Sequence, residues 1–385
     1  MAKEKQPLPQ VPATDPLVGP FLQNPAAHAM TVAWIRADDR PCEFSFGTGP
    51  DDRRGLTVSP KRAIEGEGDF FYEVVLPELN PDTCYSYALR CPGGTAESAF
   101  RTFPARVASG TFIYYGDNKS DFETHERVAT LLARHEPAFV MHSGDMTDHG
   151  GYEEYRPYFF YPLRNVIDHI PLLPGRGNHE GNGNAYRQVF SLPEGDTWYS
   201  CDYGPVHVVV LDTTGWRHEC EKDDISRMYK WCEEDLSATE AVWKLVMHHE
   251  PCYDLGWRKD DWGHKDFLPL LRRHGVDVML SGHAHGYQRL HPMKTPSEND
   301  ANPITHIVSA GAGGAIGSKP VDDSVFLAAE FRRHNYVLFT LEGESLRGRV
   351  FSDADELLDE FMLEKPGGAY TPSFLAAAMD ERQYP

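Results

Sequence analysis

The stretch TFIYYGD, residues 111–117, is a hydrophobic run that ends in a glycine and an aspartate. A short apolar run bounded by a turn signal is typical of a buried strand. A helical pattern, ETHERVATLLARH, follows at residues 123–135, and a second run of the first kind, AFVMHSGD, follows at residues 138–145. The order strand, helix, strand predicts a parallel α/β unit, which sets the fold class of this part of the chain as α/β (α+β).

The residues before this unit have a different pattern of apolar and polar side chains. Between residues 20 and 106, short alternating runs such as AMTVAWIRA and TCYSYALRC are separated by turn sequences such as LNPD and PGGT. Regular short strands with turn signals predict a β-sandwich of fibronectin III or immunoglobulin type, with Trp34 in its core. The predicted organisation is an N-terminal arm at 1–19, the sandwich at 20–106, the α/β domain at 107–365, and a tail at 366–385 with a docking helix near 374–379.

The bulk composition excludes several classes of protein. The formal net charge is −21, which argues against binding of nucleic acid polymers or anionic membranes. No apolar run is long enough for a transmembrane helix, and the polar N-terminal segment lacks the apolar core of a signal peptide. We therefore expect a cytoplasmic monomer or homodimer, or an extracytoplasmic protein if a leader was removed. The scattered cysteines favour reduced thiols, although Cys84 and Cys91 could pair across a hairpin.

Polar residues with metal-binding side chains follow the apolar runs of the α/β domain. Each lies where a strand is predicted to end: Asp117, Asp145, Asn178 with His179, His248 with His249, and His283 with His285. The carboxyl ends of parallel strands meet at one edge of a sheet, where sites form. Aspartate, asparagine and histidine without cysteine suit hard-to-borderline divalent ions, and the number of donors leaves room for two ions.

The motifs in this order, YGDNK, SGDMTDHG, RGNHE, HHEPCY and SGHAHGYQR, resemble those of the calcineurin-like metallophosphoesterases. The preceding sandwich, and SAGAGG downstream, are similar to the purple acid phosphatase branch. The resemblance implies a four-layer α/β/β/α domain that hydrolyses a small-molecule phosphate ester, with a monoester as the first expectation. A phosphodiesterase acting on a cyclic nucleotide or another diester, and a non-catalytic protein that binds a metal or ligand, stay open as alternatives.

The resemblance also implies roles for individual residues. It implies two metal ions, divalent or mixed-valence, drawn from iron, manganese and zinc, with Asp145 as the bridge between them. The remaining ligands would be Asn178, His249 and His283 for one ion, and Asp117 and His285 for the other. His179 would be the catalytic residue beside the scissile phosphate, as an orienting group or as the acid for the leaving group.

The sequence departs from the family pattern at two positions. Many of these enzymes carry D-x-H in the first motif, and Lys119 stands in place of that histidine. Purple acid phosphatases place a metal-binding tyrosine three residues after the bridging aspartate, and Asp148 stands there, so the tyrosinate colour should be absent. We predict that His125, on the apolar face of the following helix, supplies the missing ligand. Asp148 and Asn118 are rival ligands.

The remaining candidates lie around the expected site. Asp148, if it is not a ligand, would hold the ligands in place from behind, and Lys119 would contact substrate phosphate or solvent. His248 is expected in the core rather than on the metal. Aromatic and basic residues that could wall the site and contact substrate are Trp257, Arg258, Trp262 and His264, although the two tryptophans could equally serve in packing. His264 and Arg289 are candidates for a place behind the metal ligands or against the substrate.

Overall fold

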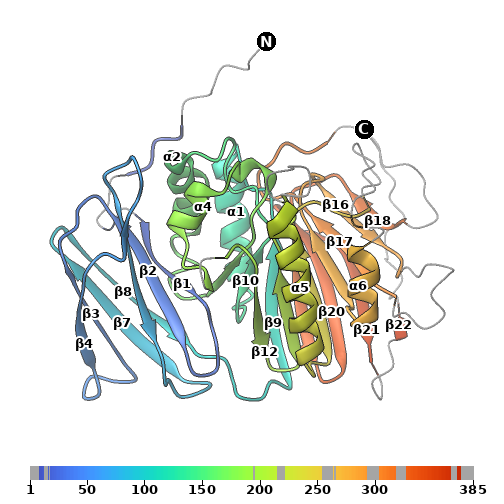
Figure 1. The fold of residues 1–385 in the computed structure, drawn as a ribbon, viewed down its shortest axis with the longest axis horizontal. Coiled ribbons are helices and arrows are strands. Elements are labelled where there is room, and N and C mark those ends of the chain that lie inside the picture. Colours follow the sequence, from blue (N-terminus) through green and yellow to red (C-terminus); the bar gives the residue numbers. More distant parts are fainter. Residues whose placement is uncertain are drawn as a thin grey trace, which may run out of the picture.

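The structure is a computed structural model, and it describes residues 8–12, 16, 18–193, 196–214, 222–253, 263, 266–292, 303–317, 327–365 and 371–373. The N-terminal strands, shown in blue in Figure 1, lie on one side of the molecule, and the orange and red C-terminal strands lie on the other. These N-terminal strands are β1 Val18–Gln23, β2 Met30–Arg36, β3 Cys42–Gly47, β4 Arg54–Val58, β5 Arg62–Ala63, β6 Phe70–Leu76, β7 Cys84–Cys91 and β8 Gly94–Arg101.

The N-terminal strands form the two sheets of the predicted sandwich. Their orders are β1-β2-β6-β5 and β4-β3-β7-β8. Trp34 of β2 is fully buried between them, with its ring 5.4 Å from that of Tyr72 and 6.3 Å from that of Phe44. The prediction of Trp34 as a core aromatic is therefore confirmed. The fibronectin III type and the domain boundaries stay predictions, although β1 begins at Val18, inside the segment expected to be an arm.

Strands β1 and β2 of the sheet β1-β2-β6-β5 have buried residues on both faces, which the alternating sequence pattern does not reveal. Leu22 and Trp34 face the core of the sandwich, whereas Phe21 and Ile35 pack with the α/β domain. Every residue of β2 is buried as a result. Backbone contacts reinforce this junction, since the Leu22 amide donates to the Ile167 carbonyl at 2.8 Å. The sandwich is therefore packed firmly against the domain that follows it.

Two further sheets form the core of the α/β domain. The first has the order β11-β10-β9-β19-β20-β21-β22, with bounds β9 Ser109–Tyr115, β10 Val140–His142, β11 Leu172–Pro174, β19 Asn335–Glu342, β20 Ser345–Ser352, β21 Leu357–Glu364 and β22 Thr371–Ser373. The second has the order β12-β13-β14-β15-β17-β16-β18, with bounds β12 Tyr199–Tyr203, β13 Val206–Val210, β14 Trp243–His248, β15 Val278–Ser281, β16 Tyr287–Leu290, β17 Thr305–Ser309 and β18 Leu327–Phe331.

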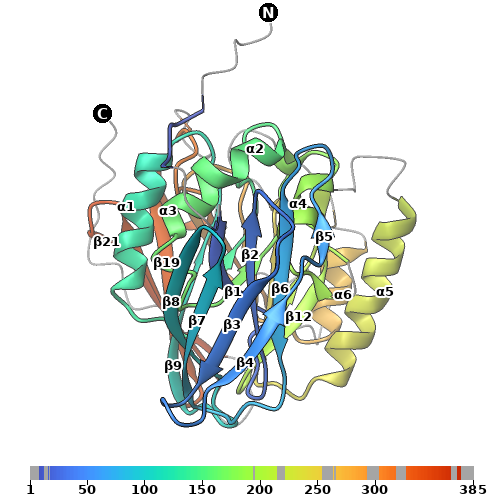
Figure 2. The same ribbon diagram turned by 90° about the vertical axis from the view of Figure 1, so that its left-hand side faces the viewer.

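Helices cover the outer faces of both sheets. The helical elements are α1 Phe122–Ala133, α2 Tyr152–Tyr155, η1 Arg156–Phe160, α3 Tyr161–Leu163, η2 Asn178–Glu180, α4 Asn184–Val189, α5 Lys222–Ala238 and α6 Phe267–Arg273. Figure 2 shows α1 and α5 on opposite sides of the molecule. Asp121 is the N-cap of helix α1, and its carboxylate accepts from the Thr124 amide at 3.0 Å and so caps the first turn.

The packing of side chains confirms the four-layer prediction. Alternate residues of a strand point to opposite faces, so Val208 packs between the two sheets while Val209 packs under α5 and α6. On the first sheet, Tyr114 faces the other sheet and Ile113 packs with Val128 of α1. The layers are therefore α/β/β/α. The docking helix expected near residues 374–379 lies outside the described residues.

The cysteine prediction is wrong. Cys42 and Cys91 form a disulfide with their Cα atoms 4.5 Å apart, and Cys84 is an exposed free thiol. Cys84 and Cys91 are the two ends of the same strand, β7, which puts them about 23 Å apart at roughly 3.3 Å per residue. Strand β3 pairs with β7 so that Glu43 is opposite Arg90, and this register brings Cys42 opposite Cys91.

Within the described residues, none of the helices combines the length and the apolar character that crossing a membrane requires.

Candidate metal centre and active site

The predicted site residues meet where strands from both sheets end. Asp117 follows β9 and Asp145 follows β10 in one sheet, while His249 follows β14 and His283 follows β15 in the other. Asp117, Asp145 and His283 have positive φ angles of 58°, 58° and 68°. Such angles are uncommon for residues other than glycine and concentrate at functional sites. The His283 amide donates to Asp117 Oδ2 at 2.9 Å, which ties the two sheets together at this edge.

Four side chains form the first group of donors. Asn178 Oδ1 lies 2.7 Å from His283 Nδ1 and 3.1 Å from His249 Nε2, and His249 Nε2 lies 3.2 Å from Asp145 Oδ1. The other ring nitrogen of His249, Nδ1, is 2.8 Å from the Ser143 carbonyl and therefore donates to it. This contact leaves the lone pair of Nε2 directed into the group, which is the arrangement that a metal-binding histidine requires.

Three side chains form the second group, and it shares Asp145 with the first. Donor atoms of Asp117, Asp145 and His285 all lie within 4.8 Å of one another. His285 Nδ1 donates to the Ala315 carbonyl at 2.7 Å, and His285 Nε2 lies 3.5 Å from Asp117 Oδ1. By residue type and spacing, the two groups fit a dinuclear centre with Asp145 as the shared ligand.

The electrostatics of both groups favour a cation. Burial disfavours charge on His249, but the Asp145 carboxylate outweighs burial and raises the pKa of His249 to about 9. Burial also opposes ionisation of Asp145, yet the charges of His249 and Lys119 hold the pKa of this carboxyl well below its usual range. For His285, the hydrogen bond with Asp117 outweighs burial and raises the pKa. A bound metal ion would displace the protons that these imidazoles attract.

His179 lies at the rim of the two groups. Its amide donates to Asp145 Oδ1 at 2.9 Å, and its Nδ1 donates to the Asp148 carbonyl at 2.6 Å. Nε2 is 4.0 Å from Asp145 Oδ2, and 34% of the side chain is exposed. The ring is thus fixed by its Nδ1 proton while Nε2 remains accessible to a ligand in the site.

Comparisons with known proteins agree with this geometry. Residues 111–287 match the family model described as calcineurin-like phosphoesterase. These residues form a calcineurin-like phosphoesterase domain. Acid phosphatase type 7 of Danio rerio is 27% identical, with 81% of this chain and 82% of the relative covered. Acid phosphatase type 7 of Homo sapiens is 26% identical, with 88% of each protein covered.

The fold agrees with a solved structure over most of its length. Purple acid phosphatase PPD1 from yellow lupin (Lupinus luteus) seeds superimposes with a TM-score of 0.78 and 17% sequence identity, covering 90% of this chain and 74% of the lupin chain. At this identity the likeness concerns the fold. It extends beyond the phosphoesterase domain and includes most of the N-terminal sandwich.

The structure corrects the expectation for Lys119 in the phosphoesterase domain. We predicted contact with substrate phosphate or solvent, but the lysine is buried, with 6% of its side chain exposed. Its Nζ forms an ion pair with Asp145 Oδ2. The backbone adds to this placement, since the Lys119 amide donates to the Asp145 carbonyl at 3.3 Å. The ammonium therefore lies in the interior of the site, on the shared carboxylate.

The structure contradicts the prediction that His125 is the missing ligand. His125 is fully buried on α1, as its position on the apolar face predicted, but both of its ring nitrogens bind elsewhere. Nδ1 donates to the Tyr158 carbonyl at 2.8 Å, and Nε2 is 3.0 Å from the Tyr115 hydroxyl. Burial lowers the pKa of His125 to about 4, so the ring is neutral near pH 7. His125 therefore packs in the protein interior, beneath the loop that carries Asp117.

Two rival ligands have partners of their own. The carboxylate of Asp148 accepts from the Ser120 hydroxyl at 2.6 Å. The amide nitrogen of Asn118 donates to the carbonyls of Met146 and Tyr158 at 3.2 and 2.8 Å. Asp148 still affects the site, because its backbone carbonyl orients His179 as described above.

The structure places Arg289, one of the outer candidates, in a buried ion pair. Its Nε lies 2.7 Å from Asp359 Oδ2, and this contact joins β16 to β21 and so links the two sheets. His248 is buried in the core with its ring edge-on to Phe267, as expected. The remaining candidates, Trp257, Arg258, Trp262 and His264, lie outside the described residues.

Sequence reasoning missed the role of Glu180, the last residue of RGNHE. Its buried carboxylate accepts from the amides of Gly177 and Asp145 at 2.7 and 2.8 Å, and from those of Met146 and Thr147 at 2.7 and 3.2 Å. Burial and the Asp145 charge raise the pKa of Glu180 to about 7. One side chain therefore fixes the two loops that carry Asp145 and Asn178. The acidic residue at the end of the ligand motif RGNHE was the sequence signal that could have indicated this role.

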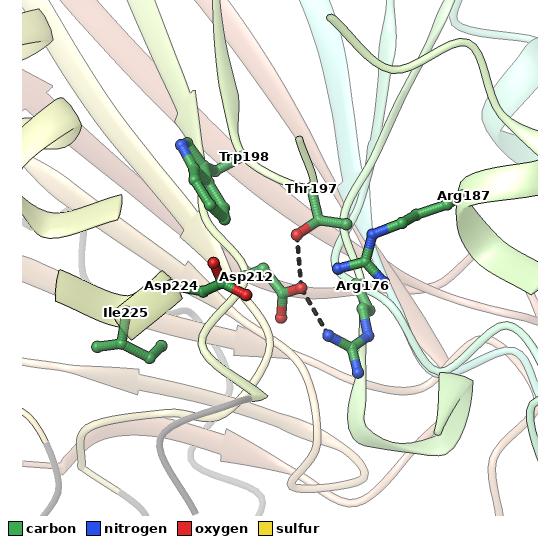
Figure 3. A pocket seen from close by; sticks show the side chains of 7 residues that line it. All are labelled: Arg176, Arg187, Thr197, Trp198, Asp212, Asp224 and Ile225. Atoms are coloured by element: carbon green, nitrogen blue, oxygen red, sulfur yellow. Dashed lines mark hydrogen bonds and ion pairs between the residues drawn. The ribbon is translucent and has the colours of Figure 1, made fainter. Parts of the chain in front are cut away.

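Arg176 supports the same turn from the other side. The guanidinium is buried, and its Nη1 donates to Asp212 Oδ2 at 2.8 Å, while Thr197 donates to the same oxygen at 2.7 Å (Figure 3). Its Nη2 donates to the carbonyl of Gly181, directly after η2. Arg176 and Glu180 together hold η2, which carries Asn178 and His179, at a fixed distance from the loop of Asp145.

Proposed function

We propose that this chain is a metal-dependent phosphomonoesterase that hydrolyses small-molecule phosphate esters. The observation that carries the proposal is the convergence of Asp145, Asn178, His249 and His283 beneath an accessible imidazole, that of His179. Carboxylate, amide and imidazole donors without thiolates suit iron, manganese or zinc, and these are the proposed metals. The relatives named acid phosphatase type 7 support a monoester as the substrate class.

The chain's own residues orient the reaction. When bound, divalent metal ions acidify water and offset the negative charge of phosphoryl oxygens. His179 Nε2 is positioned to contact the phosphoryl group or the leaving oxygen, because its Nδ1 proton is committed to the Asp148 carbonyl. One water is consumed per ester. Its oxygen stays on phosphorus, the bond from phosphorus to the leaving oxygen breaks, and that oxygen receives a proton. His179 can supply this proton from Nε2 when the ring is protonated on both nitrogens, and it regains a proton released by the water.

The fixed geometry around these groups supports catalysis in preference to simple binding. Glu180 and Arg176 restrain the turn that carries Asn178 and His179, as a catalytic constellation needs. A non-catalytic metal-binding protein has no use for an imidazole that is partly exposed and held in one orientation beside the donors.

The test is hydrolysis of an aryl phosphate monoester and a matched aryl diester. The protein would first be stripped of metal with a chelator and then supplied with Mn²⁺, Zn²⁺ or Fe²⁺. We expect turnover of the monoester that depends on added metal, and at least tenfold slower turnover of the diester. Faster turnover of the diester would establish a phosphodiesterase instead. Turnover of neither substrate with any metal would favour the non-catalytic alternative.

A further inference from the structure

The carboxylate of Asp145 has two oxygens with different surroundings. Oδ1 faces the first donor group, 3.2 Å from His249 Nε2, and accepts from the His179 amide at 2.9 Å. Oδ2 faces Lys119 and is in contact with its ammonium. A carboxylate can bridge two metal ions through a single oxygen or with one oxygen on each ion, and in the second arrangement Oδ2 would be the oxygen that the second ion needs. In this chain a lysine already binds it.

We propose that the Lys119 ammonium takes the place of the second metal ion, so that the centre holds one metal per chain. This inference rests on the proposed metal-dependent function of the same site. It concerns only how the positive charge in the site is divided between a metal ion and a side chain.

Charge and ligand number both support the replacement. An ammonium group has three N–H donors and no lone pair, so Lys119 cannot serve as a ligand. It also brings a positive charge into the group formed by Asp117, Asp145 and His285, where a divalent ion would be repelled at close range. His125, the candidate for a compensating ligand, has both ring nitrogens engaged by Tyr115 and Tyr158.

The loop around Lys119 is built to hold the ammonium in this position. The Asp117 amide donates to the Gly144 carbonyl at 3.0 Å, and the Gly314 amide donates to the Asp117 carbonyl at 2.7 Å. Both sides of Lys119 are anchored, because Asn118 before it donates to the Met146 carbonyl at 3.2 Å and the Ser120 hydroxyl after it donates to the Asp148 carboxylate at 2.6 Å. A buried ion pair with both partners fixed resists separation, since either charge alone would be left unpaired in the interior.

In the first donor group, no ammonium binds the Asp145 oxygen that faces it. Among the described residues, Asp145 Oδ1, Asn178 Oδ1, His249 Nε2 and the His283 ring converge without a lysine or arginine side chain between them. The Lys119 contact also fixes the orientation of the Asp145 carboxylate, so that Oδ1 points at this group. Lys119 is therefore a positioning residue for the single ion as well as a substitute for the other.

The test is the metal content of the intact chain, measured by elemental analysis after equilibration with Mn²⁺ or Zn²⁺ and removal of free ions. The wild type should bind one ion per chain, and K119H, which restores the D-x-H pattern, should bind two. K119M removes the ammonium without adding a ligand, so its second ion should bind at least tenfold more weakly than in K119H. K61H is the matched control, because Lys61 forms its ion pair with Glu73 in the sandwich, and it should keep one ion.

The outcomes separate this inference from the proposed function. Two ions per wild-type chain, bound as tightly as in K119H, would overturn the inference and leave the phosphomonoesterase proposal intact. A single ion in wild type, K119H and K119M alike would also overturn it, because Lys119 would then not be what excludes the second ion. No bound ion in the wild type would overturn the metal-dependent function itself. Thermal melting of each variant would show that it is folded.

Discussion

The two donor groups of the site share one aspartate yet differ in what surrounds them. Around Asp145 Oδ1, the imidazole of His249 and the amide of Asn178 present lone pairs to a common point. Oδ2 binds the ammonium of Lys119, and the same aspartate belongs to the second group with Asp117 and His285. The single-metal centre that we propose implies that an intact order of motifs does not determine how many metal ions a site holds. In this proposal, one lysine side chain occupies the position of the second ion.

Removing the shared ligand should have the largest effect, because it damages both groups at once. We expect D145N to lower kcat/KM for an aryl phosphate by about a thousandfold or more, which corresponds to the several kcal/mol that a metal supplies to the transition state. Steady-state kinetics with elemental analysis would measure it. D355N alters an exposed aspartate and should leave kcat/KM unchanged. Near-normal activity of D145N would mean that Asp145 binds no catalytic metal.

Comparing one ligand from each group tests whether the groups are unequal. We expect N178A to lower kcat/KM by about a hundredfold and to weaken metal binding, since it removes a donor from the occupied group. H285A should lower kcat/KM by about tenfold at most and leave the metal content at one ion, because its group holds the ammonium. Equal losses of activity and metal in both variants would show that the two groups bind metal alike.

Changing the support behind the first group should have an intermediate effect. E180Q keeps the size of the side chain but replaces one acceptor oxygen with an NH2 donor. This donor would face a backbone N–H that now donates to Glu180, and one hydrogen bond would be lost. The backbone amides concerned are those of Gly177, Asp145, Met146 and Thr147. We expect kcat/KM to fall by about 10- to 100-fold, the range typical of residues that orient metal ligands. E153Q, at an exposed position, is the control. Unchanged kinetics in E180Q would show that the Asp145 loop holds its position unaided.

A histidine outside the site should give the smallest effect, on stability alone. Burial lowers the pKa of His207, but its hydrogen bonds to Asp202 and Asp235, at 2.7 and 2.8 Å, outweigh burial and raise the pKa to about 9. A raised folded-state pKa means that the stabilisation is complete below the ordinary value near 6.5 and is lost as pH rises through 9.

H207Q should therefore lower the free energy of unfolding by about 1–2 kcal/mol at pH 6, with little difference from wild type at pH 10. Urea denaturation at the two pH values would measure it, with H169Q as the control for a more exposed histidine. An equal loss at both pH values would show that the ring stabilises by packing instead of charge. Any loss of metal would contradict the separation of His207 from the site.

Much of the fold and most of the metal-ligand candidates could be predicted from local sequence. Asp117 and Asp145 were recognisable because each follows a short apolar run that is typical of a buried strand, and strand ends converge in a parallel sheet. The burial of His125 followed in the same way from helical periodicity. Its hydrogen bonds did not, because Tyr158 comes from a segment 33 residues away whose path the sequence does not reveal.

The sequence by itself determined which side chains are available at the edge of the two sheets, because strand ends and helix faces are set by near neighbours in the chain. Only the tertiary structure decided how those side chains are paired. Lys119 meets Asp145 across 26 residues and Cys42 meets Cys91 across 49, through strand pairing and loop paths that depend on the whole fold. The stretch TFIYYGDNK therefore predicted a metal site. The position of Lys119 within that site depended on the loop that carries Asp145, which only the tertiary structure places beside it.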